Sequence, residues 1–242
     1  MSCQRHVAPS PQAAAEAAAH HCALLLRETL IGRQGVTLAV SGGTTPALMF
    51  DVLAREDLDW QQIHVFWVDE RNVAPGDPQS NFTMAEKHLL IPARIPASNI
   101  HRMEGEQKAG EAARRYEDEL RRFFEATPRF DVLQLGIGPD AHTASLFPGE
   151  PLVADRDGLV AAVYVEKLKQ WRITLLPGVL LAAVNTIVLA TGPDKATAVR
   201  DVFSAPFDPM LRPAQIPVHL GRNVHCFLDD ASVEDLAKRG AG

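Results

Sequence analysis

Cysteine is scarce in this sequence, and no Cys-x-x-Cys pair occurs among its 242 residues. The chain has three cysteines, Cys3, Cys22 and Cys226, which cannot all pair with one another. This count and spacing favour a reducing compartment over a disulfide scaffold. Cys22 lies in a run rich in alanine and leucine, where we expect it to fill a small space in the core rather than to react.

Long apolar runs are also missing. The N-terminus shows no charged region followed by an apolar stretch, as a signal peptide would have. No apolar run approaches the roughly 20 residues that a membrane-spanning helix needs. With 24 basic against 30 acidic residues, the formal net charge of −6 argues against nucleic acid or an anionic membrane as the main partner. We therefore expect a cytoplasmic protein, and nothing in the sequence indicates an oligomeric state.

Several signature motifs are absent as well. There is no Gly-x-Gly-x-x-Gly, and no glycine-rich loop ends in Gly-Lys-Ser or Gly-Lys-Thr, so the sequence lacks a dinucleotide fingerprint and a P-loop. No Gly-x-Ser-x-Gly elbow occurs, and no second histidine stands at metal-ligand spacing from His142. These absences disfavour a serine hydrolase of that class and a metal centre at His142.

What the sequence does contain is a regular alternation of short apolar runs and amphipathic runs. The apolar runs predict strands at 36–41, 63–70, 130–138, 185–192 and 223–230. The helical spacing predicts helices at 10–31, 45–55, 80–90, 110–127 and 194–203, and a short one from Ser232. Such alternation is typical of βαβ units, so we predict an α/β fold with a doubly wound, mostly parallel sheet flanked by helices. Residues 158–177 hold two strand-like runs, which we interpret as a small antiparallel addition.

Ligands of such sheets bind beyond the carboxyl ends of the strands, so the residues that follow each strand are the candidates for function. Four of these segments are rich in glycine and polar residues: 41–46, 69–81, 136–148 and 191–196. In the first, Gly42 and Gly43 allow backbone amides to approach a ligand, and Thr44 adds a hydroxyl beside a helix N-terminus, which attracts anions. A tight turn capped by a threonine would explain the same residues.

The second and fourth segments carry charges. Asp69, Glu70 and Arg71 come directly after an apolar run. A guanidinium suits a phosphate or carboxylate, but Arg71 could instead pair with its acidic neighbours in a surface loop. Lys195 lies at the predicted start of a helix, where the helix dipole favours a negative charge rather than a positive one. A bound anion would explain this placement, and an ordinary surface lysine is the alternative.

The third segment, GIGPDAHTASLFP, is the strongest candidate for catalysis. Imidazole exchanges a proton near neutral pH, so His142 suits a general base, and Asp140 can orient its ring and stabilise the cationic form. We expect backbone amides of residues 138–142 to stabilise an oxyanion. Ser145 lacks a nucleophile elbow, so a role in capping or loop bonding is preferred for it. A tight connector with incidental polar residues is the alternative for the whole segment.

Taken together, the four segments resemble the 6-phosphogluconolactonase family in order and spacing. The likeness rests on LAVSGGTTP, on WVDERNV followed by SNF, on GIGPDAHTASLFPG, and on RITLLP followed by TGPDKA. It extends from about residue 10 to about residue 230, and GxDxHTASLFP is its specific element. SGGTTP alone would also fit glucosamine-6-phosphate deaminases, which share the superfamily fold. The resemblance implies one domain over residues 1–242 with a Rossmann-like sheet.

The resemblance also implies an activity: hydrolysis of 6-phospho-D-glucono-1,5-lactone to 6-phospho-D-gluconate, the second step of the oxidative pentose phosphate pathway, with no cofactor or metal. His142 would be the general base for the attacking water, with Asp140 as its partner. Carried over position by position, the sugar phosphate would be bound by a set of loop residues: Gly42, Gly43, Thr44, Arg71, Arg172 and Lys195. Asp69 and Glu70 would shape the loop or contact sugar hydroxyls. The expected partner is a small phosphorylated lactone, not a nucleic acid or a membrane.

Two departures from the family pattern concern the site. Ala141 stands where the family usually has glycine, which costs about 1 kcal/mol if that position requires a positive φ. KLKQW at 167–171 stands where the family usually has a proline-rich segment before RIT, and this difference affects whether the phosphate-binding role can be carried over to Arg172. Trp171 would be either a packing residue or part of the pocket wall. The alternatives to a lactonase are a sugar-phosphate deaminase or isomerase of the same fold and a non-catalytic sugar-phosphate-binding protein.

Overall fold

The computed structural model describes residues 3–237, and at its centre is a seven-stranded sheet in the order β1-β10-β9-β6-β2-β3-β5. All neighbouring strands in this sheet are parallel, which confirms the predicted sheet type. The strands are β1 (Gln4–Ala8), β2 (Val36–Val40), β3 (Ile63–Trp67), β5 (Ile100–His101), β6 (Val132–Gly136), β9 (Asn185–Ala190) and β10 (Val224–Asp229). The short edge strands β1 and β5 lie where the sequence pattern predicts none.

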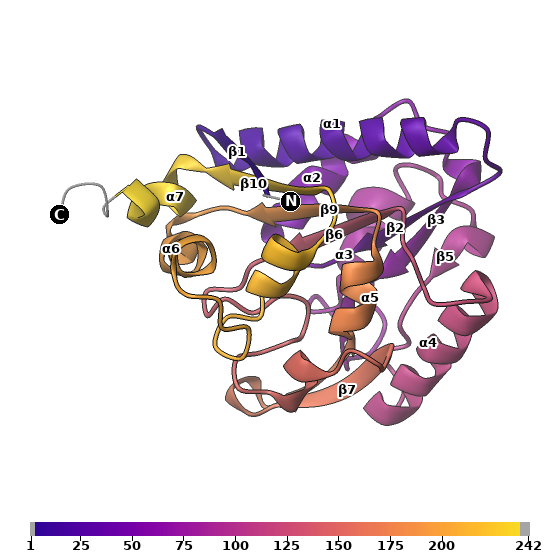
Figure 1. The fold of residues 1–242 in the computed structure, drawn as a ribbon. Helices are drawn as coiled ribbons and strands as arrows, with labels where there is room; N and C mark the ends of the chain where they lie inside the picture. The colour runs from indigo at the N-terminus through magenta and orange to yellow at the C-terminus, as the bar shows by residue number, and fades with distance from the viewer. Residues whose placement is uncertain (1–2, 238–242) are drawn as a thin grey trace.

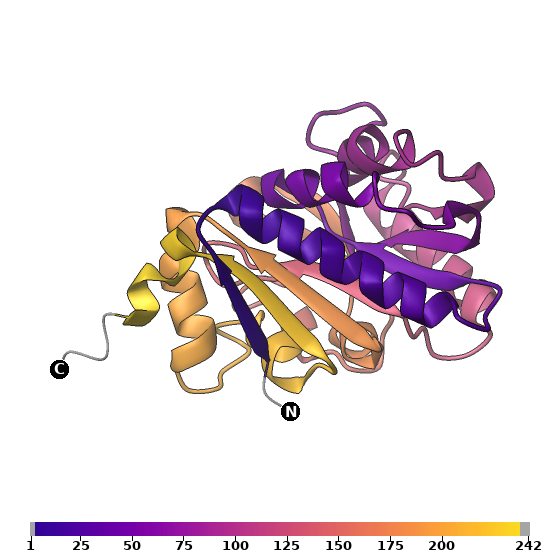
Figure 2. The same ribbon diagram turned by 90° about the horizontal axis from the view of Figure 1, so that it is seen from above.

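Helices cover both faces of this sheet. Figure 1 shows α1 across one face and α5 on the opposite face, and Figure 2 shows α1 running over the strands. The helices are α1 (Pro11–Leu30), α2 (Thr44–Leu53), α3 (Asn81–Ala85), α4 (Ala109–Phe124), α5 (Pro177–Ala182), α6 (Ala196–Ser204) and α7 (Asp230–Ala237). Every residue of β2 and β9 is buried, because helices exclude water from both sides of the central strands. No helix within residues 3–237 has the length and apolar character needed to cross a membrane.

Helix α1 begins and packs as its sequence predicts. The Ser10 hydroxyl accepts a hydrogen bond from the amide of Ala13, and Pro11 occupies the first helical position. Its buried stripe consists mostly of alanines, which let the helix axis approach the sheet closely. Cys22 belongs to this stripe and is fully buried, and burial raises the pKa of its thiol to about 12. Cys22 is therefore a packing residue, as expected.

A second, antiparallel sheet of three strands has the order β4-β8-β7. It consists of β4 (Asp69–Arg71), β7 (Val160–Val165) and β8 (Gln170–Leu175), so the predicted antiparallel addition is confirmed. The prediction of one strand over 63–70 is wrong, because the chain changes sheets at Val68. The amide of Val68 donates a hydrogen bond to the carbonyl of Val40 in β2. Its carbonyl accepts a hydrogen bond from the amide of Leu175 at the end of β8. This switch takes Asp69 out of the main sheet.

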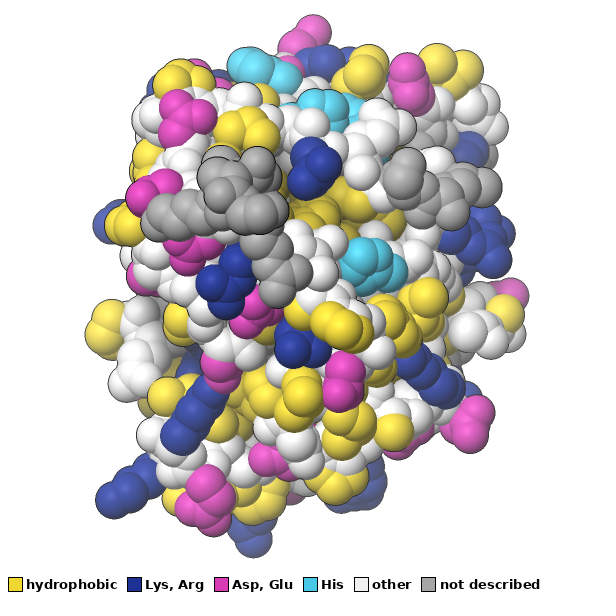
Figure 3. Space-filling model, turned by 60° about the vertical axis from the view of Figure 1, so that its left-hand side comes forward, with side chains coloured by type: hydrophobic (Ala, Val, Ile, Leu, Met, Phe, Trp, Pro, Cys, Tyr) yellow, Lys and Arg dark blue, Asp and Glu magenta, His cyan; other side chains and the backbone are white. Residues whose placement is uncertain are grey.

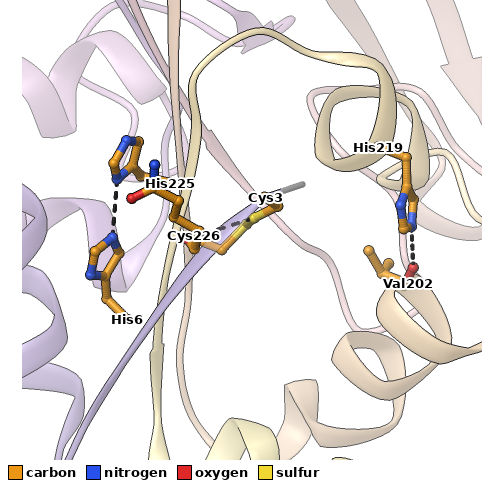
Figure 4. Close-up of a disulfide and its surroundings, with 7 residues drawn as sticks. Cys3, His6, Val202, His219, His225 and Cys226 are labelled. Carbon is orange, nitrogen blue, oxygen red and sulfur yellow. Dashed lines mark hydrogen bonds between the residues drawn. A yellow bond between two sulfur atoms is a disulfide. The ribbon is translucent and has the colours of Figure 1, made fainter. Parts of the chain in front are cut away.

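The edge strand β1 is tied to its neighbour by a disulfide between Cys3 and Cys226, shown in Figure 4. The two residues are 223 positions apart in sequence, but β1 lies parallel to β10 and pairs Arg5 with Cys226, which leaves a Cα–Cα distance of 6.7 Å between the cysteines. This single disulfide leaves Cys22 unpaired and is not the disulfide scaffold that the cysteine count and spacing disfavoured. Spacing along the sequence did not reveal it, because the pairing depends on which strands become neighbours.

Candidate active site

A pocket of about 210 Å³ lies beyond the carboxyl ends of β2, β6 and β9, where an α/β sheet of this kind binds its ligands. All four loops singled out in the sequence contribute to it, and β8 adds a fifth segment. The structure brings these predicted residues to its wall: Gly42, Gly43, Thr44, Asp69, Arg71, His142, Arg172 and Lys195. Of the other two predicted residues, Asp140 bonds His142 and Glu70 lies behind the wall.

The glycine loop opens helix α2 toward the pocket. Gly43 is the N-cap of α2 and has a φ of 124°, a value that only glycine adopts readily, and no side chain caps the helix. Gly42 is required for a different reason, since a Cβ there would lie 1.7 Å from the Asn81 side-chain oxygen. The first amides of α2 therefore have no side-chain partner and lie at the positive end of the helix dipole. A threonine cap, the simpler interpretation of this turn, is absent.

Arg71 and Arg172 form the basic part of the wall. They are direct partners in the register of β4 and β8, so their side chains lie next to each other. Both Nε atoms are buried without a hydrogen-bond partner in the described part of the chain. Burial and the charge of Arg71 lower the pKa of Arg172. Two adjacent guanidinium groups with unused donors repel each other unless an anion lies between them. The altered segment before Arg172 has not removed it from the pocket.

Lys195 completes the cationic set. It ends the 3₁₀ turn Pro193–Lys195 just before α6, and its ammonium lies 3.2 Å from the Asp194 carboxylate. The Lys195 side chain is largely covered, with 24% of its surface exposed, although Asp194 is mostly exposed. Lys195 differs from an ordinary surface lysine because most of its side chain is covered by the pocket wall. It adds a third positive charge to the pocket that contains Arg71 and Arg172.

Glu70 holds the loop between β4 and α3 in shape. Its carboxylate accepts hydrogen bonds from the amides of Arg71, Asn81 and Phe82 at 2.7–2.8 Å and from the Ser80 hydroxyl at 3.0 Å. Burial raises the pKa of Glu70 even though these four donors act in the opposite direction. Within residues 3–237 no ion pair joins Glu70 to Arg71. The loop is thus organised by amide donors rather than by an internal ion pair.

Asp69 is buried in the pocket wall and links two loops. It accepts a hydrogen bond from the Ser145 hydroxyl at 2.7 Å and one from the Asn81 side chain at 3.3 Å. The amide of Ser145 in turn donates to the Thr174 hydroxyl. Ser145 therefore uses its hydroxyl and its amide for bonds to β4 and β8, in agreement with the interpretation that it is not a nucleophile. Asn81 belongs to the SNF segment, and its contact with Asp69 was not visible in the sequence pattern.

The histidine loop, residues 136–149, presents His142 to the pocket. His142 Nδ1 lies 2.5 Å from Asp140 Oδ1, and the backbone amide of His142 donates to the same oxygen at 3.3 Å. Burial alone would raise the pKa of Asp140, but hydrogen bonds from His142 and Lys167 outweigh it and hold the pKa well below its usual range. Asp140 is thus ionised and fixes Nδ1 as a donor. Nε2 is then the ring nitrogen that is left to accept a proton.

Two small residues determine the shape of the histidine loop. A Cβ at Gly138 would lie 2.0 Å from the imidazole of His142, so glycine is needed where the ring is seated. Ala141 has a φ of 63°, which confirms that the position usually occupied by glycine requires a left-handed backbone. The Ala141 carbonyl accepts from the amide of Ala214 at 2.9 Å, and its own amide donates to Gly138. These bonds hold the alanine in a strained conformation, and the loop keeps its form.

The expected oxyanion donors of this loop are mostly occupied. The amide of Gly138 donates to the carbonyl of His142, that of Ala141 to the carbonyl of Gly138, and that of His142 to Asp140. Residue 139 is a proline and has no amide hydrogen. The prediction of oxyanion donors from residues 138–142 is therefore wrong for three of its amides. Periodicity and composition did not reveal that the loop uses these groups to hold itself together.

Sequence reasoning also missed Lys167, which donates a hydrogen bond to Asp140 from the tip of the β7–β8 hairpin. The signal was the KLKQW segment at 167–171, of which the sequence interpretation considered Trp171 and the effect on the following Arg172. Trp171 itself is 46% exposed and packs against Tyr164 with ring centroids 5.4 Å apart, outside the pocket wall. Nowhere in residues 3–237 do three or more His, Cys, Asp or Glu side chains gather as a metal site.

Comparison with known proteins agrees with this geometry. A sequence model of the family described as glucosamine-6-phosphate isomerases/6-phosphogluconolactonase matches residues 9–225. The chain belongs to this family. A relative from Synechocystis sp., named 6-phosphogluconolactonase, is 38% identical over 205 residues, which is 83% of this chain and 84% of the relative. One of the same name from Haemophilus influenzae is 35% identical and covers 83% of this chain and 88% of its own length.

Solved structures of similar proteins have the same fold as this chain. The structure of 6-phosphogluconolactonase from Trypanosoma brucei superposes with a TM-score of 0.86 at 28% identity, covering 97% of this chain and 99% of that one. A monomeric glucosamine-6-phosphate deaminase superposes with a TM-score of 0.83 at 20% identity and covers 96% of this chain and 99% of its own, which shows a shared fold. The architecture described above is therefore shared by both of these solved structures.

Proposed function

We propose that this protein hydrolyses 6-phospho-D-glucono-1,5-lactone to 6-phospho-D-gluconate, the second step of the oxidative pentose phosphate pathway. The observation that carries the proposal is the pairing of His142 with an ionised Asp140 beside a pocket that contains three basic side chains. These are Arg71 of β4, Arg172 of β8 and Lys195 at the start of α6. The relatives from Synechocystis and Haemophilus influenzae, both named 6-phosphogluconolactonase, support the same substrate. A lactone with a phosphate at one end needs a base and an anion site together, and this pocket contains groups suited to both.

The chemistry requires no covalent intermediate, because a lactone is already an activated ester. Nε2 of His142 removes a proton from water while the water oxygen forms a bond to the lactone carbonyl carbon. When the tetrahedral intermediate collapses, the bond from that carbon to the ring oxygen breaks, and the ring oxygen takes the proton back from Nε2. Asp140 stabilises the imidazolium between these two steps. A base positioned in this way contributes about 10²–10⁴-fold to the rate.

Binding of the phosphate would fix the lactone against this base. We propose that the phosphate is bound by the amides of Gly43 and Thr44 and by the side chains of Arg71, Arg172 and Lys195. Among the described residues, the two amides have no side-chain partner, the Nε atoms of both arginines are unpaired, and the lysine carries a positive charge. Remote binding of this kind orients the carbonyl and lowers the entropic part of the barrier. Asp69 is placed to accept a hydrogen bond from a sugar hydroxyl, while Glu70 supports the loop from behind.

We also propose that the chain acts as one domain over residues 1–242, because a single cluster of buried hydrophobic residues includes side chains of both sheets. Figure 3 shows basic and acidic side chains interspersed on the face that it presents, with no continuous basic stripe of the kind that nucleic acid requires. A cytoplasmic location stays a prediction, since a disulfide such as Cys3–Cys226 is more typical of an oxidising compartment.

One assay separates the proposed activity from its alternatives. Freshly generated 6-phosphogluconolactone is supplied at neutral pH, and acid release is followed against the spontaneous rate for wild type and His142→Ala. We expect clear acceleration by wild type and a loss of about 10²-fold or more in the variant. No acceleration by wild type would contradict the lactonase and favour a binding protein. Ammonia release from glucosamine 6-phosphate would indicate the deaminase branch of the family.

A further inference from the structure

Lys167 reaches the histidine loop from another sheet. It lies in the 3₁₀ turn Glu166–Leu168 at the tip of the β7–β8 hairpin, and its Nζ donates a hydrogen bond to Asp140 Oδ2. The other carboxylate oxygen of Asp140 bonds Nδ1 of His142. Nζ also lies 4.6 Å from the centroid of the Phe147 ring, and that ring is 4.4 Å from the ring of His142. Lys167 thus contacts two side chains that hold the imidazole.

An ammonium in this position affects the imidazole in two ways. Because it bonds Oδ2, it fixes the carboxylate whose Oδ1 orients the ring of His142. Its positive charge also competes with a protonated imidazole for the one carboxylate, so it favours the neutral ring that can accept a proton from water. The Lys167 side chain is 51% exposed, so the electrostatic part of this effect is screened by salt.

Other charges also face the pocket. Arg71, Arg172 and Lys195 line the same wall as His142, and Asp69 is the acid among the described lining residues. The carboxylate of Asp140, however, receives its hydrogen bonds from His142 and from Lys167. The three lining cations are suited to an anionic ligand, which would neutralise them when it binds. Lys167 shares a carboxylate with His142 and is not among the described lining residues of the pocket.

We propose that Lys167 is a positioning residue for the lactonase reaction, which holds Asp140 in place and keeps His142 in the neutral form that removes the proton from water. This inference rests on the function proposed above. It assigns a role to the KLKQW segment at 167–171, which includes the tip of the β7–β8 hairpin. Without the ammonium, the carboxylate acts on the imidazole alone, and the ring stays protonated to higher pH.

The test measures kcat and KM for freshly generated 6-phosphogluconolactone between about pH 5 and about pH 8. It compares wild type with Lys167→Met, Lys167→Arg and the matched control Lys169→Met, which removes an exposed lysine from the same hairpin. In Lys167→Met we expect the acid limb of kcat/KM to move upward by roughly 0.5–1 pH unit, with KM changed by less than about twofold. Lys167→Arg should restore the profile, and Lys169→Met should follow wild type.

A second readout does not depend on catalysis. The side-chain ¹⁵N resonances of His142, identified by their loss in His142→Gln, are titrated in wild type and in Lys167→Met, with Lys167→Gln as a substitute if the methionine variant does not fold. The titration midpoint should rise in the variant, and the rise should shrink at high salt. If wild type is inactive on the lactone, the proposed function fails, but the NMR titration still tests the effect of Lys167.

Three outcomes would overturn the role of Lys167. In the first, wild type is active, and both the acid limb and the NMR midpoint of Lys167→Met coincide with those of wild type. In the second, kcat falls by the same factor at every pH, as expected for a residue that only supports the fold. A rise of the midpoint that is equally large in Lys169→Met would also contradict the proposal, because it would reflect net charge rather than the bond to Asp140.

Discussion

Arg71 and Arg172 face each other across the register of β4 and β8, and the Nε atom of each is buried without a partner in the described residues. Like charges at this separation destabilise the free protein, since burial and the neighbouring guanidinium both lower the pKa of Arg172. A dianionic group between them would relieve the repulsion and use the free donors. This unfavourable pairing supports the proposal that the two arginines bind the phosphate of the substrate.

Removing one of these cations should weaken phosphate recognition selectively. We expect Arg71→Ala, Arg172→Ala or Lys195→Ala to reduce affinity for 6-phosphogluconate by about 10–100-fold, the usual range for a lost charge-assisted hydrogen bond. Affinity for unphosphorylated gluconate should change little. Calorimetric titration of both ligands provides the measurement, with Lys169→Ala as a control for net charge. Equal losses for the two ligands would contradict the phosphate assignment.

The left-handed backbone at Ala141 leads to a prediction about loop variants. Ala141→Gly relieves the strain of a positive φ but loses a buried methyl group, so its free energy of unfolding should stay within about 1 kcal/mol of wild type. Ala141→Val places a β-branched side chain in the same conformation, and we expect a loss of more than about 2 kcal/mol together with most of the activity. Urea unfolding and the lactone assay check both. A valine variant as stable as wild type would mean that the loop does not hold this φ.

A half-buried histidine of α1, His21, predicts how stability depends on pH. Burial, followed by the charges of His225 and His6, lowers the pKa of His21 from 6.5 to about 4, and its Nε2 has no partner among the described residues. The unfolded chain therefore binds a proton below about pH 6.5 that the native protein does not bind until about pH 4. Stability is unaffected above that window and falls as pH decreases through it, by up to about 2 kcal/mol once solvent screening of the half-exposed ring is taken into account.

His21→Leu should remove most of this fall, because the leucine does not titrate. The neighbouring His20→Leu is the matched control, since His20 is exposed and bonds Glu56. Urea unfolding at several values between about pH 4 and about pH 7 gives the free energies to be compared. The histidine explanation is contradicted if His21→Leu loses as much stability on acidification as wild type and His20→Leu do.

Much of the fold followed from local pattern. The runs that became β2, β6, β9 and β10 are short and mostly apolar, and the intervening amphipathic runs became helices, so the parallel sheet could be predicted. The run at 63–70 shows where such reasoning ends. An apolar run does not show that its last residues pair with another sheet, because that depends on β8, about a hundred residues further along the chain.

The sequence by itself determined which residues follow the strands, and the geometry of parallel sheets then requires Gly42, Asp69, His142 and Lys195 to lie near one another. Only the tertiary structure decided that Arg172 lies opposite Arg71, that Cys3 pairs with Cys226, and that Lys167 bonds Asp140. It also decided that the amides of the histidine loop bond within the loop. The physical reason is one of range. Periodicity and turn chemistry act over a few residues, whereas these contacts depend on the register and packing of segments that are distant in the chain.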